Sequence, residues 1–496
     1  MENYTKYLNA VGEFGIVREV NHPIVIISGL PYTRPHEIVL FETGQWGEVY
    51  SIEKDMIEVL VFSKDPIKVG TQLTRTNNFL SIPIGPELLG KMVDPLGNPF
   101  SANSVFKKPQ EYREIITDVQ GIGSRSRIKE PFNTGVNVVD IMIPLGKGQK
   151  ELVIGDRKTG KTAFLLSMIK SQAKLGTVAV YAAIGKRKSD IKKLKEFFIK
   201  EKIENNVIIV ASSSQDSPSL INLTPYSAMA IAEYFRDKGQ NAIVLLDDLS
   251  THSKVYREIA LVSKRFPGRE SYPGDIFYIH ARLLERSGNF KHPQKGEVSI
   301  TCFPVVEIVE GDLTGYISTN LMGMTDGHIF FDSNVYYKGR RPAINLSLSV
   351  TRVGRQTQTA LNREINRELT AFLGLYERME NFSHFGAELS EKIKGILRTG
   401  QKIYRFFNQH YGVIVPSTVQ LVIFALIWAK VFDESTDDSL DDFSEKLIAA
   451  YTDDKNKIFF DDLVNAENLY KLLTNVTKKK EEIFKLCKLN LASKQI

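Results

Sequence analysis

Cysteine is nearly absent from this chain of 496 residues, since Cys302 and Cys487 are its only two. Two cysteines so far apart exclude a disulfide scaffold and indicate a reducing compartment. The most apolar stretch, Leu421–Ala429, is about half as long as the roughly 18–20 residues that a membrane-spanning helix needs. The amino terminus also lacks the basic start and apolar core of a signal peptide. We therefore expect a soluble intracellular protein in which Leu421–Ala429 forms a buried helix.

The excess of positive over negative charge is also small. Lys and Arg total 64 against 58 for Asp and Glu, which gives a formal net charge of +6 at pH 7. A nucleic-acid-binding surface needs clustered basic residues and stacking aromatics, and the amino-terminal segment shows no such cluster. We therefore expect no nucleic-acid partner. A transcription-termination helicase, or another P-loop motor on nucleic acid, is an alternative that the composition disfavours.

The order of the expected elements divides the chain into three parts. Residues 1–80 contain short β-branched runs such as Ile24–Ser28 and Ile57–Phe62, which predict a small β-barrel. In residues 81–358, apolar strands alternate with helices, and this alternation predicts a parallel sheet covered on both faces. In residues 359–496 the strand signals fade, and the apolar periodicity predicts a helical domain.

The most specific local pattern is a phosphate-binding loop. The run Gly155–Thr162, GDRKTGKT, fits G-x-x-x-x-G-K-[ST] and lies between an expected strand, Glu151–Gly155, and an expected helix, Thr162–Lys174. Such a loop wraps backbone N–H groups around phosphate oxygens at the positive end of a helix. Lys161 is expected to reach the outer phosphates of ATP or ADP, and the Thr162 hydroxyl is expected to bind Mg²⁺. The predicted nucleotide-binding residues here are Gly155, Asp156, Arg157, Lys158, Thr159, Gly160, Lys161 and Thr162.

A carboxylate beside this loop is the second expected feature of the site. The apolar run Ala242–Leu246 ends in Asp247 and Asp248. In P-loop proteins a carboxylate at the tip of a neighbouring parallel strand helps to hold Mg²⁺. Asp247 is the better candidate, so we predict that it contacts both nucleotide and metal.

A base for hydrolysis is missing where it would be expected. Hydrolysis needs a group, usually Glu or Gln, that positions water against the γ-phosphate. The natural place follows the expected strand Val178–Ile184, and there the chain reads Gly185–Lys188, GKRK. Lys186 can bind phosphate but cannot orient water as a carboxylate does. The sequence therefore predicts nucleotide binding without hydrolysis, which disfavours a stand-alone ATPase.

Together with these sites, the chain resembles one family from about residue 10 to about residue 430. It is similar to the α subunit of F-type rotary ATPases (ATP synthases). The catalytic β subunit of that family shares the fold, but it has Gly-Glu-Arg after the strand where this chain has Gly185-Lys186-Arg187. The α subunits usually have Gln at the middle position, so Lys186 differs from both the α-type and the β-type residue. The matching runs are Pro83–Gly97, Gly155–Thr162, Pro225–Gly239, Leu245–Ser250, Pro267–Arg286, Tyr337–Asn345 and Ser349–Gly354.

The resemblance implies a fold and a set of partners. The fold is an N-terminal β-barrel, a central P-loop (RecA-like) α/β nucleotide-binding domain and a C-terminal α-helical domain. The assembly is a hexamer in which α-type subunits alternate with catalytic β-type subunits around a central γ-type stalk. It lies in the cytoplasm at the inner face of the cell membrane, with a peripheral stalk and membrane machinery as indirect partners. The α-type subunits hold Mg-ATP at non-catalytic sites.

The resemblance also assigns residues on two further surfaces. Arg352, after the strand-like run Ala343–Val350, is implied to be a catalytic residue that is donated to the neighbouring β-type site. There a cation in trans would stabilise the charge of the transferring phosphoryl group, and an interface salt bridge is the alternative role. Arg341, Pro342 and Gln409 match the adenine-side contacts of the family. Tyr411 takes the place of a second glutamine there, and its ring could stack on the base.

The resemblance weakens at both ends of the chain. Typical α subunits have a few tens of residues before the barrel, which is expected here to begin almost at Met1, and the last 60 or so residues match the family poorly. We therefore expect a non-catalytic, arginine-donating subunit of a rotary ATPase. It belongs either to a standard synthase or to an F-type-like hydrolytic motor that is not coupled to ion transport and serves motility or a surface process. Divergent paralogues of the second kind are known in wall-less bacteria.

Overall fold

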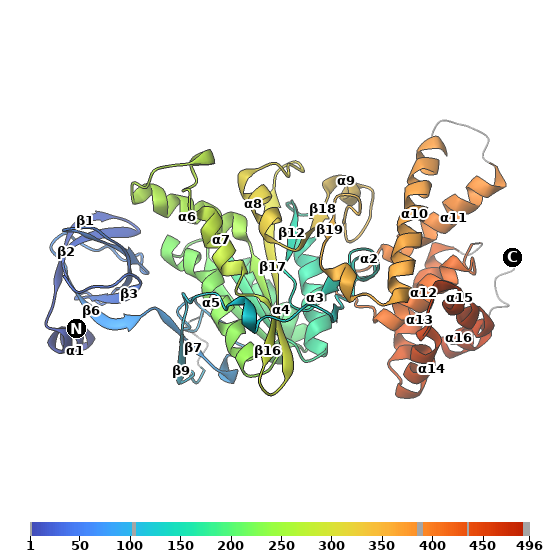
Figure 1. Cartoon of the computed structure of the whole chain (residues 1–496), viewed down its shortest axis with the longest axis horizontal. Helices are drawn as coiled ribbons and strands as arrows, with labels where there is room; N and C mark the ends of the chain where they lie inside the picture. The colour runs from blue at the N-terminus through green and yellow to red at the C-terminus, as the bar shows by residue number, and fades with distance from the viewer. Residues whose placement is uncertain (1, 102–105, 384–389, 434–435, 490–496) are drawn as a thin grey trace.

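The computed structural model describes residues 2–101, 106–383, 390–433 and 436–489. The chain runs from a barrel at one end, through a central α/β domain, to a helical domain at the other end (Figure 1). The amino and carboxyl termini lie at opposite ends of the molecule. This order confirms the predicted fold class.

The amino-terminal part is a closed antiparallel barrel with the strand order β1-β2-β5-β4-β3-β6. Its interior is filled by alternate apolar side chains such as Val17, Val39 and Val59, which are fully buried. A helix that we did not predict, α1 (Glu2–Val11), precedes the barrel and packs beside β6, where the Tyr4 hydroxyl donates a hydrogen bond to Gln72. The strands are β1 (Gly15–Asn21), β2 (Ile24–Gly29), β3 (Glu37–Phe41), β4 (Trp46–Ile52), β5 (Ile57–Val61) and β6 (Gln72–Phe79).

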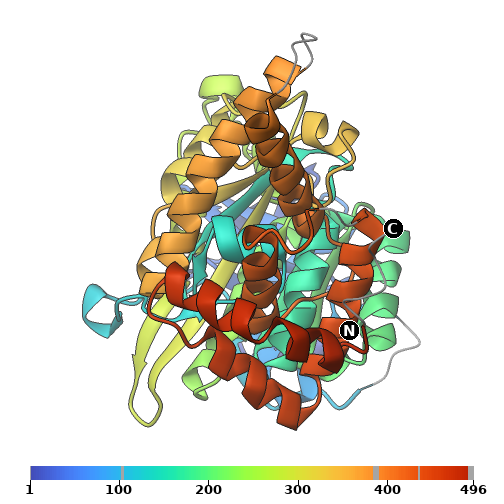
Figure 2. The same cartoon turned by 90° about the vertical axis from the view of Figure 1, so that its right-hand side faces the viewer.

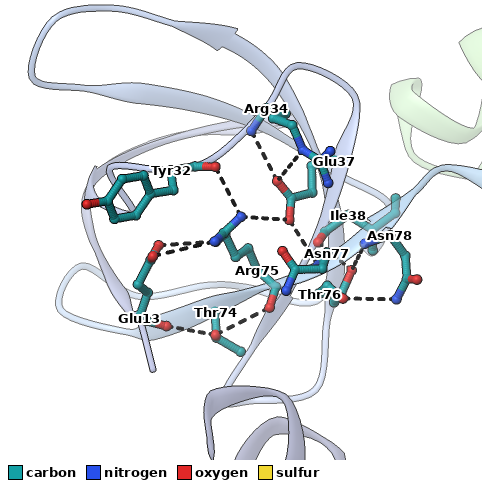
Figure 3. A network of polar contacts seen from close by, with 10 residues as sticks. All are labelled: Glu13, Tyr32, Arg34, Glu37, Ile38, Thr74, Arg75, Thr76, Asn77 and Asn78. Carbon is teal, nitrogen blue, oxygen red and sulfur yellow. Dashed lines mark hydrogen bonds and ion pairs between the residues drawn. The ribbon is translucent and has the colours of Figure 1, made fainter. Parts of the chain in front are cut away.

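A polar network closes one end of the barrel around Glu37 (Figure 3). The Glu37 side chain is fully buried and accepts a hydrogen bond of 2.9 Å from the backbone N–H of Asn77. Arg75 lies 3.7 Å from Glu37, donates to Glu13 at 3.1 Å, and donates to the carbonyl oxygen of Tyr32 at 3.0 Å. The buried carboxylate thus accepts two backbone hydrogen bonds, the second from the Arg34 N–H at 3.1 Å, and the Arg75 guanidinium of β6 is its nearest cation.

The central domain is built on a nine-stranded sheet with the order β19-β18-β12-β17-β15-β13-β14-β8, in which β16 also pairs with β17. All neighbours from β18 to β8 are parallel, and β19 and β16 are antiparallel additions. The strands are β8 (Met92–Val93), β12 (Glu151–Asp156), β13 (Val178–Lys186), β14 (Val207–Ser213), β15 (Ala242–Asp247), β16 (Gly288–His292), β17 (Gly296–Ile308), β18 (Gly327–Phe331) and β19 (Val350–Thr351). Two small sheets pair β7 (Ser81–Ile84) with β9 (Glu111–Glu114) and β10 (Pro131–Phe132) with β11 (Leu145–Gly146).

Both faces of the large sheet are buried, because successive residues of its strands enter two different cores. In β13, Tyr181 belongs to the core that includes α3 and α4, whereas Val180 and Ala182 belong to the core that includes α5 and α6. The helices are α2 (Asn137–Met142), α3 (Lys161–Lys174), α4 (Lys188–Lys200), α5 (Pro218–Asp237), α6 (Leu249–Val262), α7 (Ile276–Leu284), α8 (Tyr316–Met324) and α9 (Ser333–Tyr337). Short 3₁₀ turns are η1 (Pro86–Leu88), η2 (Ile122–Ser124), η3 (Glu204–Asn206), η4 (Arg269–Ser271) and η5 (Gly354–Thr357).

One expected strand is largely absent. The apolar run Ala343–Val350 is not a continuous strand, because Asn345 turns the chain: its side-chain oxygen accepts hydrogen bonds of 3.1 Å from the backbone N–H groups of Ser347 and Leu348. Such local side-chain bonds offer the backbone an alternative to a sheet. The strand begins only at Val350, as the two-residue β19.

The carboxyl-terminal domain contains helices and no strands in its described residues (Figure 2). Its buried side chains share one core with those of α3 and α4. The helix α12 contains Leu421–Trp428 and is buried among its neighbours, as predicted. None of the helices in the described ranges combines the length and apolar character needed to cross a membrane. The helices are α10 (Ala360–Ser383), α11 (Glu391–Phe407), α12 (Ser417–Trp428), α13 (Asp437–Tyr451), α14 (Asp454–Val464), α15 (Leu469–Lys478) and α16 (Lys480–Leu486).

We predict that Arg75→Met destabilises the barrel by about 3–5 kcal/mol, because it leaves the buried Glu37 carboxylate without its main cationic partner. Hydrogen exchange of the β3 and β6 amides measures this local stability. Arg34→Met is the matched control: Arg34 is 53% exposed and only 4.0 Å from the same carboxylate, so its loss should cost less than about 1 kcal/mol. Equal effects of the two changes would contradict the role given to Arg75.

Candidate functional site

The expected phosphate-binding loop connects the end of β12 to the start of α3. Gly155 is required here because a Cβ atom at this position would lie 2.2 Å from the backbone oxygen of Phe331. Asp156 anchors the loop, since its carboxylate accepts hydrogen bonds from the Gly311 N–H at 3.0 Å and the Ser333 hydroxyl at 2.8 Å. The loop is therefore fixed to β18 and to the segments that follow β17 and β18.

Lys161 is buried inside the loop. Its ammonium donates to the carbonyl oxygens of Gly155 at 2.8 Å and Asp156 at 2.6 Å, and the Thr159 hydroxyl also donates to Asp156 O, at 2.7 Å. Burial lowers the pKa of Lys161, and the nearby carboxylates, of which Glu307 has the largest effect, oppose this shift. The ammonium is thus held where bound phosphate oxygens could replace two carbonyl oxygens as its partners.

The other residues of the loop lie at its rim. Gly160 adopts a φ of 100° and forms the N-cap of α3, with open space where a Cβ atom would point. Thr162 is exposed in the first turn of α3, so its hydroxyl lies at the helix N-terminus. Lys158 is exposed, and Arg157 forms an ion pair of 2.8 Å with Glu307. All eight predicted residues therefore form one continuous loop.

Asp247 and Lys186 meet at the same edge of the sheet. They end β15 and β13, which are parallel neighbours. The Lys186 ammonium lies 2.8 Å from Asp247 Oδ1 and 3.0 Å from Asp248 Oδ2, and the Tyr181 hydroxyl donates to Asp247 Oδ2. Burial on its own lowers the pKa of Lys186, but the two carboxylates outweigh burial and raise that pKa above its ordinary value. Lys186 is therefore a firmly charged partner of both carboxylates, a contact that its position in the sequence did not predict.

The oxygen donors at this edge fit magnesium that arrives with a nucleotide. Mg²⁺ in nucleotide sites keeps several waters and is held by one or two protein oxygens together with substrate phosphates. Asp247 supplies a carboxylate, whose two oxygens here contact Lys186 and Tyr181, and Thr162 supplies a hydroxyl; both groups are donors of this kind. In the described part of the chain, no group of three or more His, Cys, Asp or Glu side chains forms a separate metal cage.

A cavity of about 260 Å³ opens beside the loop, on the side of the helical domain. It is bordered by Thr159 and Gly160 at one end and by residues of α3, of the Arg341–Pro342 segment and of the 408–413 segment. This volume is slightly below the range of about 300–1,000 Å³ that is typical of whole-ligand sites. The cavity therefore suits the base of a nucleotide whose phosphates lie outside it, on the loop.

Gln409 lines this cavity, but its amide is already used by the backbone. Nε2 donates to the carbonyl oxygens of Gly135 at 2.8 Å and Val413 at 2.7 Å, and Oε1 accepts from the Asn137 N–H at 3.0 Å. The backbone N–H of Gln409 also donates to the Arg341 carbonyl oxygen at 2.7 Å. In this structure Gln409 thus fixes the wall of the cavity.

Arg341, Pro342 and Tyr411 lie on the same cavity. The guanidinium of Arg341 stacks 3.5 Å from the centre of the Tyr336 ring and donates to the Tyr336 carbonyl oxygen at 2.7 Å. Tyr411 packs against Phe197 of α4 with ring centres 5.5 Å apart and remains 58% exposed. The structure therefore brings all the predicted adenine-side residues together.

The far wall of the cavity includes an ion pair that we did not predict from the sequence. Arg405 of α11 donates to Asp441 of α13 at 3.0 Å, and both residues border the cavity. The partners are 36 positions apart in sequence, so no local pattern could have paired them. This ion pair makes α13 part of the cavity wall.

Arg352 lies near the amino-terminal ends of the parallel strands, on the side of the sheet opposite the phosphate loop. Thr351 pairs with Gly327, and Gly327 pairs with Glu151, the first residue of β12, whereas the phosphate loop follows the last. With about 3.3 Å per residue, the six-residue β12 separates these edges by about 16 Å. Arg352 is exposed, and its guanidinium donates to the Met322 carbonyl oxygen at 2.9 Å. The structure thus does not bring Arg352 to the loop of its own chain.

A glycine-containing loop between a parallel strand and a helix, with a carboxylate on a nearby strand, is typical of a P-loop nucleotide-binding fold. Residues 135–351 match the nucleotide-binding domain of the ATP synthase alpha/beta family, and residues 358–482 match the C-terminal domain of the ATP synthase alpha/beta chain. The second match extends well into the last 60 or so residues. It therefore corrects our expectation of poor resemblance there.

Individual relatives agree with these matches. The ATP synthase subunit alpha of Orientia tsutsugamushi (strain Boryong) is 38% identical over 84% of this chain and 83% of its own length. The subunit of the same name from Helicobacter pylori (strain HPAG1) is 36% identical over 88% of this chain and 87% of its own length. The chain therefore belongs to the ATP synthase alpha/beta family, and the resemblance found in the sequence is confirmed.

We predict that Lys161→Ala weakens binding of ATP and ADP by about 10- to 100-fold, because charged hydrogen bonds of this kind contribute about 1.5–3 kcal/mol. Titration calorimetry with the purified chain measures the change. Lys174→Ala is the control, since Lys174 is exposed at the far end of the same helix and should leave binding unchanged. If Lys161→Ala bound ATP and ADP with wild-type affinity, Lys161 would not be a phosphate-binding residue.

Proposed function

We propose that this chain is the non-catalytic, nucleotide-binding subunit of an ATP synthase-type rotary complex and that it donates Arg352 to the catalytic site of a neighbouring β-type subunit. The observation that carries the proposal is the presence of Lys186, paired with Asp247 and Asp248, where a water-activating carboxylate would be needed. The phosphate loop is complete, but a base for hydrolysis is replaced by a cation.

The charges around Lys161 support the non-catalytic role. The carboxylates that act on it most strongly are those of Glu307, Asp247 and Asp248. Glu307 pairs with Arg157, and the two aspartates pair with Lys186. A general base needs an oxygen that can accept a proton from the attacking water. Each of these carboxylates instead has a cationic partner.

Nucleotide binding follows from the residues of the loop and the cavity. The backbone N–H groups of the loop and the N-terminus of α3 would receive the phosphate oxygens. Lys161 would exchange two carbonyl oxygens for phosphate oxygens. Tyr411 and Pro342 line the cavity, and their rings would contact the base. Asp247 and Thr162 would hold Mg²⁺, which neutralises phosphate charge when it is bound.

The position of Arg352 supports a role in another chain. About 16 Å of β12 separates it from its own loop, and its side chain is exposed at the edge of the domain. A cation delivered across an interface stabilises the charge that spreads over a transferring phosphoryl group. Arg352 therefore serves a neighbour's γ-phosphate, whereas Lys161 serves the nucleotide of its own chain.

The proposed partners are those of the rotary assembly: a catalytic β-type subunit in an alternating hexamer, a central γ-type stalk, and peripheral-stalk or membrane machinery at the inner face of the membrane. The same subunit role serves either a synthase or a hydrolytic motor that is not coupled to ion transport. Purification of the native complex distinguishes the two settings, because membrane-ring and peripheral-stalk subunits accompany only the coupled machine.

The isolated chain should bind Mg-ATP and hydrolyse it negligibly, because the carboxylates that act on Lys161 are each paired with a cation. Steady-state phosphate release by the pure protein measures this. Release at a rate typical of enzymes, about 1 per second or faster, would contradict the non-catalytic assignment. In the assembled complex, Lys161→Ala should leave part of the hydrolysis intact, since the chemistry resides in the partner.

We predict that Arg352→Ala and Arg352→Lys lower turnover of the reconstituted hexamer by about 10³–10⁵-fold. Lysine does not replace arginine, because only the planar guanidinium can hold two phosphate oxygens at once. Nucleotide binding by the isolated variant should stay unchanged. Arg355→Ala is the control: Arg355 is exposed three positions later and should preserve turnover.

Assembly of each hexamer is verified by size-exclusion chromatography before turnover is measured. Near-normal turnover of the assembled Arg352→Ala hexamer would show that Arg352 has no role in the partner's chemistry. A loss of turnover that is fully explained by failed assembly would make Arg352 an interface residue instead.

A further inference from the structure

We infer that Lys186 is a built-in cation of the nucleotide site that lowers its requirement for magnesium. The inference rests on the proposed binding of nucleotide by this chain and adds a property that the proposed function does not contain. The inference follows from the two carboxylates with which the Lys186 ammonium pairs. One of them is Asp247, the carboxylate at the metal-binding edge of the sheet.

The two carboxylates are held facing this ammonium. Asp247 and Asp248 are 5% and 3% exposed, so bulk water screens neither charge effectively. The second oxygen of Asp247 accepts from the Tyr181 hydroxyl, and the second oxygen of Asp248 accepts from the Thr251 N–H at 2.7 Å. These bonds fix the orientation of both side chains and leave Oδ1 of Asp247 and Oδ2 of Asp248 directed at Lys186.

Lys186 is held as firmly as its partners. It is the last residue of β13, pairs with Ser213 of β14, and its carbonyl oxygen accepts from the Ser214 N–H at 2.9 Å. The preceding residue, Gly185, has a φ of 60°, and a Cβ atom there would lie 2.9 Å from the Thr251 side chain. The turn at Gly185 and the pairing with β14 therefore fix the backbone from which the ammonium reaches Asp247 and Asp248.

The charge of Lys186 changes what a bound nucleotide requires. The site holds three carboxylates close to Lys161, from Glu307, Asp247 and Asp248, and these repel phosphate unless they are neutralised. Arg157 pairs with the first, and Lys186 pairs with the other two. The neutralisation that a divalent cation normally supplies at such an edge is therefore partly present in the chain itself.

The same contact weakens the hold of the site on the metal. A cation that binds Asp247 must share this carboxylate with an ammonium 2.8 Å from Oδ1, and like charges oppose each other at such distances. Both effects lower the dependence of nucleotide binding on magnesium. Lys186 strengthens nucleotide binding without magnesium and reduces the gain when magnesium is added.

The experiment measures the dissociation constant of ADP for the full chain in excess MgCl₂ and in EDTA, by titration calorimetry. For the wild type we expect the two constants to differ by less than about tenfold. In Lys186→Gln, which removes the charge, we expect the EDTA-to-magnesium ratio to rise by about tenfold or more, which corresponds to about 1.4 kcal/mol. Lys186→Arg keeps the charge and should keep a ratio near that of the wild type. Lys188→Gln removes an exposed charge two positions away and should leave the ratio unchanged.

The outcomes separate this inference from the proposed function. If the affinity of the wild type for ADP is more than about tenfold lower in EDTA than in magnesium, the inference is overturned and nucleotide binding stands. An equal ratio in wild type and Lys186→Gln also overturns it. If the wild type binds ADP under neither condition, the proposed binding function itself fails. Should Lys186→Gln not fold, the wild-type ratio decides the matter alone, since it does not depend on any variant.

Discussion

The parallel register of β12, β15 and β13 is the constraint on which the candidate site depends. Carboxyl ends of parallel strands meet at one edge of a sheet, so the phosphate loop, Asp247 and Lys186 converge although they are far apart in the sequence. Burial of both faces of these strands holds that edge rigid. The barrel and the helical domain lie at the two ends of this unit, and the helical domain completes the cavity beside the loop.

The two functions that we propose lie at opposite ends of the parallel strands. At the carboxyl edge, Lys161 and the loop serve a nucleotide of the same chain, while Lys186 takes the place of a base. At the amino-terminal ends of the strands, Arg352 is exposed, about 16 Å from the phosphate loop of its own chain. We propose that such a subunit binds nucleotide without hydrolysing it and contributes Arg352 to hydrolysis in the neighbouring subunit. Membership of the ATP synthase alpha/beta family is consistent with this division.

The sequence was sufficient to predict the fold class and the loop, because strand–helix alternation and the spacing within Gly155–Thr162 are local patterns. It did not predict α1, although Gly12, with a φ of 73° directly after the helix, is a common helix-terminating residue. It also indicated a strand where Asn345 turns the chain. The pairing of Lys186 with Asp247 and that of Arg405 with Asp441 were also missed. Each joins residues on different elements, so only the register of the sheet or the packing of the helices could reveal it.

The measurement that tests the central claim most directly follows the fate of the nucleotide on this chain while the assembled complex turns over. A photoreactive ATP analogue is bound during steady-state hydrolysis, cross-linked, and recovered on the separated chains. The account predicts an unhydrolysed triphosphate on this chain, attached near Tyr411, after many turnovers by the partner. Recovery of diphosphate on this chain, formed at the turnover rate of the complex, would contradict the account.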